Sequence, residues 1–273
     1  METRVIGGIE IAYHAMGNTG AKPIVLIHGL TASASDWRQT AGALVTEGWR
    51  VLSPDCPGHG SSAAPRDAEA YSTESVADVL HMLAEALGWE PAVIVGNSMG
   101  GAIAQEYAIR HPGSVMALVL VDSAGDLRRP LPKPTGHHEF VELERALAFE
   151  QGMAAVWDLH QERRGWLYSG NLSPQAQAWR RQRILAVSPE GYIYGDRALG
   201  DRRKTLPDLA RLRCRTLVVC CENEEEYLRE VSEDLTRTIP AAQYEVIPRA
   251  WHQPHLENPV AFIDVLLRFL ESL

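Results

Sequence analysis

The stretch Gly96-Asn97-Ser98-Met99-Gly100-Gly101 joins a continuous apolar run, residues 92–95, to a segment with helical spacing, residues 99–110. A sharp turn from a strand into a helix crowds the backbone, so small residues must flank Ser98, and the glycines meet that need. Gly-x-Ser-x-Gly in this context is typical of a nucleophilic serine. The amino end of the following helix also stabilises developing negative charge. Ser98 is therefore the candidate nucleophile.

Strands and helices alternate on both sides of this turn. The predicted strands are short, continuous apolar runs, as expected where both faces of a sheet are covered. Alternation of this kind is typical of βαβ units and a mostly parallel sheet. Asp36 is expected to cap the first helix. The predicted strands are residues 24–27, 50–53, 92–95, 117–121, 216–220 and 243–247, after a hairpin at 4–14, and the main helices are 37–47, 72–87, 99–110, 225–238 and 259–270.

The alternation stops in the middle of the chain. Residues 126–206 begin Pro-rich and continue with mainly helical stretches, 139–163 and 174–186, and contain no strong buried strand. We expect an α/β core formed by residues 1–125 and 207–273, with 126–206 inserted between two of its strands.

Composition limits the partners and the location. The 273 residues are 45% hydrophobic and 22% charged, enough for one large core. A formal net charge of −9 repels phosphate backbones and anionic lipid, so we expect no nucleic acid and no membrane partner. Residues 1–8 show no targeting pattern, which predicts a cytoplasmic protein. A homodimer is compatible with the sequence. The four cysteines lack metal-ligand spacing and are expected to be reduced thiols: Cys56, Cys214, Cys220 and Cys221.

A serine hydroxyl needs a base to take its proton. His252 follows the last predicted strand and precedes the last helix, at the sheet edge that also presents Ser98. His255 is its competitor. His28 and His59 lie in turn motifs, where hydrogen bonds to the backbone are expected. The histidines on helices and in the insertion, among them His160, are expected to face solvent.

Acyl transfer also needs hydrogen-bond donors for an oxyanion, usually backbone N–H groups. Met99 directly follows the nucleophile and supplies one of them. Leu30 lies in the loop after the first buried strand, where Gly29 allows a tight turn, and supplies the other.

Four motifs in this order resemble the α/β-hydrolase superfamily nearly end to end. They are Ile27-His28-Gly29-Leu30, then 55–61 (Asp-Cys-Pro-Gly-His-Gly-Ser), then the turn at Ser98, and finally 252–259 (His-Gln-Pro-His-Leu-Glu-Asn-Pro). The resemblance implies a mostly parallel central sheet flanked by helices, with the insertion as a helical cap over the active site. It also implies Leu30 and Met99 as oxyanion donors, and no metal or organic cofactor.

The third member of the catalytic triad departs from the pattern of the resembled family. That family places Gly-x-x-Asp after the strand that follows the cap, whereas this chain has Cys221 at the glycine and Glu224 at the aspartate. A glutamate can orient the imidazole, but its extra methylene requires a shifted backbone. Asp122, at the end of the preceding strand, is the rival. Trp251 fills a place that the family often gives to glycine.

Nucleophile, base and oxyanion donors together predict hydrolysis of a carboxylic ester or lactone in a small molecule. The elbow resembles that of meta-cleavage product hydrolases, which cleave a carbon–carbon bond, although Gln253 stands where those enzymes usually have tryptophan. A ligand receptor on the same fold is a third interpretation. Haloalkane dehalogenase and epoxide hydrolase chemistry needs a carboxylate at position 98, so Ser98 argues against both reactions. Aromatic residues of the insertion suggest an apolar pocket, with ordinary packing as the alternative: Trp157, Trp166, Tyr168, Trp179, Tyr192 and Tyr194.

Overall fold

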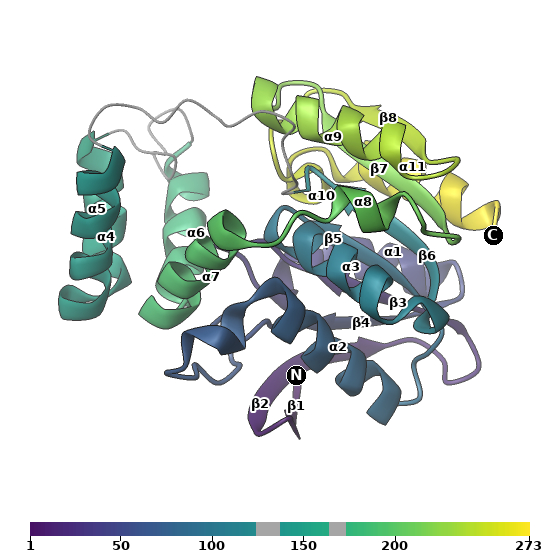
Figure 1. Cartoon of the computed structure of the whole chain (residues 1–273), viewed down its shortest axis with the longest axis horizontal. Coiled ribbons are helices and arrows are strands. Elements are labelled where there is room, and N and C mark those ends of the chain that lie inside the picture. Colours follow the sequence, from purple (N-terminus) through teal and green to yellow (C-terminus); the bar gives the residue numbers. More distant parts are fainter. Residues whose placement is uncertain (124–136, 164–172) are drawn as a thin grey trace.

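The computed structural model describes residues 1–123, 137–163 and 173–273 (Figure 1). Eight strands form one sheet in the order β1-β2-β4-β3-β5-β6-β7-β8. The first two pairings, β1 with β2 and β2 with β4, are antiparallel, and every other pairing is parallel. This is the expected α/β-hydrolase architecture. The strands are β1 (Glu2–Ile6), β2 (Ile9–Met16), β3 (Lys22–Ile27), β4 (Trp49–Pro54), β5 (Ala92–Asn97), β6 (Val115–Val121), β7 (Arg215–Cys221) and β8 (Gln243–Ile247).

Helices cover both faces of the sheet. α1 (Arg38–Thr46) and α11 (Pro259–Glu271) pack on one face, and α2 (Thr73–Ala86), α3 (Met99–Arg110) and α9 (Glu226–Thr238) pack on the other. Because neither face meets water, all four residues from Ile24 to Ile27 are fully buried. Full burial of such a side chain stabilises the fold by about 1.5–3 kcal/mol. The continuous apolar runs of the sequence have this physical origin.

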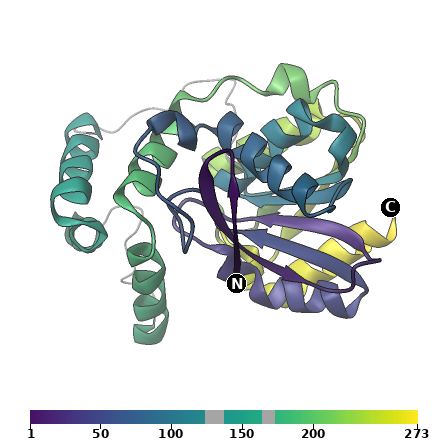
Figure 2. The same ribbon diagram turned by 90° about the horizontal axis from the view of Figure 1, so that it is seen from below.

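Among the described residues, helices α4 to α7 follow β6 in the sequence and lie beside the sheet in space (Figures 1 and 2). The predicted helix at 139–163 is two helices, because Gly152, at φ +82°, separates them. The expected start of the insertion at residue 126 lies outside the described residues. The helices are α4 (His137–Gln151), α5 (Met153–Arg163), α6 (Pro174–Leu185) and α7 (Pro189–Asp201).

Short helices complete the described chain. They are η1 (Ala34–Trp37), η2 (Ala68–Tyr71), η3 (Pro112–Ser114), α8 (Leu206–Leu209) and α10 (Pro254–Glu257). Within the described ranges, no helix combines the length and apolar character needed to cross a bilayer. All four cysteines are free thiols.

Candidate active site

Ser98 sits on a strained turn between β5 and α3. Its backbone has φ 55° and ψ −115°, a left-handed conformation that costs energy for any residue except glycine. A Cβ at Gly96 would overlap the Gly100 carbonyl, and a Cβ at Gly100 would overlap the Ile27 carbonyl. The expectation that small residues must flank Ser98 is confirmed, and the turn places Ser98 at the carboxyl edge of the sheet.

His252 and Glu224 are in direct contact at the same edge. His252 follows β8, Glu224 lies between β7 and α9, and Nδ1 of the imidazole is 2.5 Å from Oε2 of the carboxylate. The second oxygen of Glu224 accepts the Glu225 N–H at 2.8 Å. The Glu224 side chain is 4% exposed and the imidazole 36%. The contact therefore holds a nearly buried carboxylate against Nδ1 of the imidazole.

The surroundings raise the pKa of His252 above its usual value. Burial by itself lowers the pKa, but the hydrogen bond to Glu224 and the negative charges of Glu224, Asp122 and Glu257 outweigh burial. An imidazole with a raised pKa is a stronger base for a hydroxyl proton.

Asp122 is buried next to this pair but binds a different residue. Its carboxylate accepts the backbone N–H and the thiol S–H of Cys221, each at 2.9 Å. Burial, followed by the charge of Glu224, raises the pKa of Asp122 to about 7. Of the two acids weighed from the sequence, Glu224 contacts the imidazole and Asp122 is held by Cys221, the residue at the family's glycine position.

A hydrogen bond from Asn97 links the turn at Ser98 to the histidine loop. The Asn97 amide donates to the carbonyl of His252 at 3.0 Å and to that of Val121 at 3.2 Å. Between Ser98 and the imidazole the described residues show no hydrogen bond, a contact that in many hydrolases tightens only with substrate. Sequence reasoning missed Asn97. The signal in the sequence was a polar side chain at the end of an apolar strand.

The loop carrying Leu30 is held by two buried histidines. Nε2 of His59 lies 2.6 Å from the Leu30 carbonyl oxygen, and Nε2 of His28 accepts the Cys56 N–H at 2.9 Å. Burial lowers the pKa of His28 to about 3, so its ring is neutral. The expected backbone-bonding role of both histidines is confirmed. The N–H groups of Leu30 and Met99 make no hydrogen bond to any residue that the structure describes.

Two other histidines are structural. His255 stacks on Trp37 with ring centroids 4.0 Å apart, and burial lowers its pKa well below the usual value, so it is a poor base. The expectation that His160 faces solvent is wrong. This residue is fully buried in the insertion, and its Nε2 lies 2.5 Å from Glu144.

Arg183 links α6 to η1 and to the segment that follows His252. Its guanidinium donates to Asp36 and, at 3.1 Å, to the side-chain oxygen of Gln253, the neighbour of His252. The side chains of Arg183 and Asp36 are 8% and 1% exposed, so the ion pair is nearly dry. The expectation that Asp36 caps a helix is therefore wrong: it lies inside η1, and α1 starts without a side-chain cap.

Aromatic residues of the insertion differ in exposure. Trp157 and Tyr192 are buried, and the Tyr192 hydroxyl donates to Glu144, so both pack inside the insertion. Trp179 is 43% exposed. Trp166 and Tyr168 lie outside the described residues.

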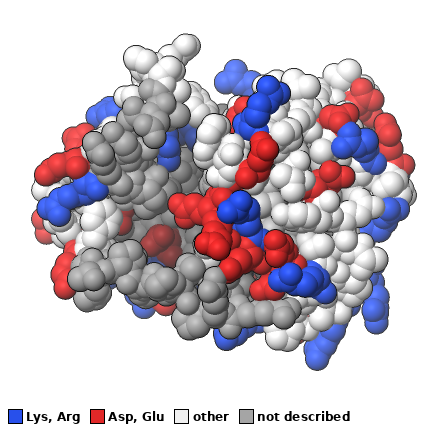
Figure 3. Space-filling view, turned by 90° about the horizontal axis from the view of Figure 1, so that it is seen from above, with Lys and Arg blue, Asp and Glu red and all other residues white. Residues whose placement is uncertain are grey.

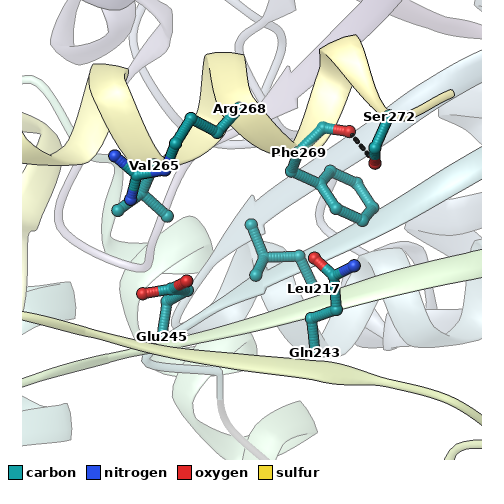
Figure 4. Close-up of a pocket in the computed structure, with 7 residues that line it drawn as sticks. All are labelled: Leu217, Gln243, Glu245, Val265, Arg268, Phe269 and Ser272. Carbon is teal, nitrogen blue, oxygen red and sulfur yellow. Dashed lines mark hydrogen bonds between the residues drawn. The ribbon is translucent and has the colours of Figure 1, made fainter.

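A shallow pocket elsewhere has no catalytic constellation. It lies between α11 and the amino-terminal halves of β7 and β8, whereas Ser98, Glu224 and His252 follow the carboxyl ends of their strands (Figure 4). The candidate catalytic residues therefore lie at the opposite edge of the sheet from this pocket. The pocket between α11, β7 and β8 is lined by Leu217, Gln243, Glu245, Val265, Arg268, Phe269 and Ser272.

The sheet, the strained serine turn and the paired histidine define a class of enzymes built for nucleophilic hydrolysis. Comparison with known proteins agrees: residues 22–259 match the model of the alpha/beta hydrolase fold family. The chain belongs to this family and is a serine hydrolase.

Similar proteins within the family catalyse several reactions. Lipase 1 of Psychrobacter immobilis is 28% identical, over 92% of this chain and 77% of its own. The 2-hydroxymuconate semialdehyde hydrolase of Pseudomonas sp. strain CF600 is 29% identical, over 97% of this chain and 92% of its own. A thermophilic esterase from Thermogutta terrifontis superposes with a TM-score of 0.81 at 26% identity, covering 99% and 98% of the two chains.

Proposed function

We propose that the protein hydrolyses a carboxylic ester or lactone of an apolar small molecule through an acyl-enzyme at Ser98. His252 is the general base, Glu224 orients it, and the N–H groups of Leu30 and Met99 bind the oxyanion. The observation that carries this assignment is the 2.5 Å contact between His252 and Glu224 at the sheet edge that presents Ser98.

In the proposed reaction, the Ser98 oxygen attacks the carbonyl carbon while Nε2 of His252 takes the hydroxyl proton. The tetrahedral oxyanion is stabilised by the N–H groups of Leu30 and Met99, which have no described partner to give up. Collapse breaks the carbon–oxygen bond to the leaving group, which receives the proton from His252. Water then attacks the acyl-enzyme by the same route and regenerates Ser98.

The charge of the molecule favours a neutral substrate. The formal net charge is −9, and Figure 3 shows Asp and Glu side chains gathered near the middle of one face. Anionic molecules are repelled by such a field, whereas neutral apolar esters are not. Lipase 1 and the thermophilic esterase, both named for ester cleavage, support this class of substrate. We also propose a cytoplasmic location, with which four cysteines that form no disulfide are compatible.

The test compares wild type with Ser98→Ala on aryl and alkyl esters and lactones. Alanine fits the turn, so the variant should keep its melting temperature and lose turnover. A fluorophosphonate probe should label wild type at Ser98 alone. Wild-type rates in folded Ser98→Ala would refute the nucleophile assignment.

Cleavage of a carbon–carbon bond is the second candidate. The elbow sequence and the 29% identical 2-hydroxymuconate semialdehyde hydrolase favour it. Against it, Gln253 follows the histidine, and its side-chain oxygen is bound to Arg183. A meta-cleavage dienol offered beside the esters separates the two reactions by their kcat/KM values. Ligand binding without turnover of any substrate would indicate a receptor.

A further inference from the structure

The amino end of α7 is seated directly on the core. The Ser188 N–H donates to the carbonyl of Gly58 at 2.7 Å, and the Ser188 hydroxyl caps the helix by accepting the Gly191 N–H at 2.9 Å. A Cβ at Gly191 would lie 2.5 Å from the Gly58 carbonyl oxygen. Backbone therefore meets backbone here, and the start of α7 has no room to shift toward the core.

One turn further along α7, Gly195 meets the two residues assigned to the oxyanion. A Cβ at position 195 would lie 2.8 Å from Cδ1 of Leu30 and 3.5 Å from Sδ of Met99. Two carbons in contact are normally about 3.5–4.0 Å apart, so any side chain at this position collides with Leu30. Figures 1 and 2 show α6 and α7 between the α4–α5 pair and the sheet, as these contacts require.

Leu30 has little freedom to yield. Its side chain is 8% exposed and that of Met99 is 5% exposed, so both are enclosed between the sheet and α7. The Leu30 carbonyl is held by His59 at 2.6 Å. The Leu30 side chain therefore has little room to move away from position 195, and the proposed oxyanion donor is the N–H of the same residue.

We propose that Gly195 is a positioning residue of the active site. Because it has no side chain, α7 packs directly against Leu30 and Met99, and the N–H groups of these two residues keep the geometry that the oxyanion needs. This inference rests on the proposed function and assigns a catalytic consequence to one contact of the cap. Removing an oxyanion donor costs about 100- to 1000-fold in kcat, and a displaced donor loses part of that. We therefore expect Gly195→Ala to lower kcat by on the order of tenfold, with little change in KM.

Gly200 provides the matched control. It lies in the same helix, and no atom comes within 4 Å of a Cβ placed there. Alanine favours the helical backbone at both positions, so the two variants differ in the contact alone. Gly200→Ala should keep the wild-type kcat and KM.

The experiment measures ester kinetics and thermal melting for Gly195→Ala, Gly200→Ala, Leu30→Ala and the double variant Gly195→Ala/Leu30→Ala. Leu30→Ala removes the atom that collides, so Gly195→Ala should cost nothing further in that background. Wild-type kinetics in Gly195→Ala would overturn the proposal, as would an equal cost in both backgrounds. A kcat loss that follows a lowered melting temperature would also overturn it. Ser98→Ala, measured beside these variants, separates this failure from failure of the proposed function, because retained turnover in Ser98→Ala refutes the mechanism itself.

Discussion

Replacing Glu224 by glutamine should remove most of the activity. In the reaction His252 becomes an imidazolium 2.5 Å from the Glu224 carboxylate. With charge centres about 4 Å apart in an effective dielectric of about 20, their attraction is about 4 kcal/mol. Each 1.36 kcal/mol is a factor of ten in rate, so loss of the charge alone costs about 1000-fold. Glutamine also favours the wrong imidazole tautomer, which brings the expected loss in kcat to about 10,000-fold.

Two variants serve as comparisons. Asp122→Asn changes a buried carboxyl group that binds Cys221 and not the imidazole and that is only partly ionised near pH 7, so it should cost no more than about tenfold. Glu225→Gln makes the same chemical change at the exposed neighbouring residue and should be neutral. Activity is measured as kcat on an aryl ester, with melting curves to show that each variant is folded.

The outcome that refutes the reasoning is a reversal of this order. If Asp122→Asn collapses activity while Glu224→Gln keeps it, the contact in the structure is not the one that serves catalysis. Equal losses in both variants would mean that the two carboxylates act as one unit.

Three further predictions concern charge. Because the pKa of His252 is raised and only the neutral imidazole accepts a proton, kcat/KM should fall as pH falls, with its midpoint above about 6.5; a midpoint below that value contradicts the raised pKa. Burial and the charge of Glu224 raise the pKa of Asp122 to about 7, so between about pH 4 and pH 7 the unfolded chain has released this proton while the folded protein retains it. Urea titrations should therefore show this group lowering stability as pH rises through that window, and Asp122→Asn should lack that part of the slope. Arg183→Met strands the buried carboxylate of Asp36 and should lower the free energy of unfolding by about 3 kcal/mol or more, whereas adding Asp36→Asn should recover part of it; no recovery would place the cost elsewhere.

Local patterns in the sequence were sufficient to predict the parallel strands, the turn at Ser98 and the position of His252. Continuous apolar runs predicted the parallel strands because a strand covered on both faces has no polar side, and β8 begins and ends where expected. The glycines around Ser98 predicted the strained turn because no side chain fits there. The position of His252 after the last strand followed from the shared carboxyl edge of parallel strands.

Tertiary structure decided which side chains meet. Glu224 and His252 are 28 positions apart and Asn97 and His252 are 155 apart, and no local periodicity specifies such pairs. Both Glu224 and Asp122 follow strands ending at the correct edge, so the sequence left two acids. Which acid contacts His252 depends on the packed backbone. Cys221 binds Asp122, whereas the longer side chain of Glu224 extends to the imidazole. Packing also decided that His160 lies against Glu144 and that Asp36 pairs with Arg183. A buried polar group needs a hydrogen-bond partner, and the fold determines which partner lies beside it.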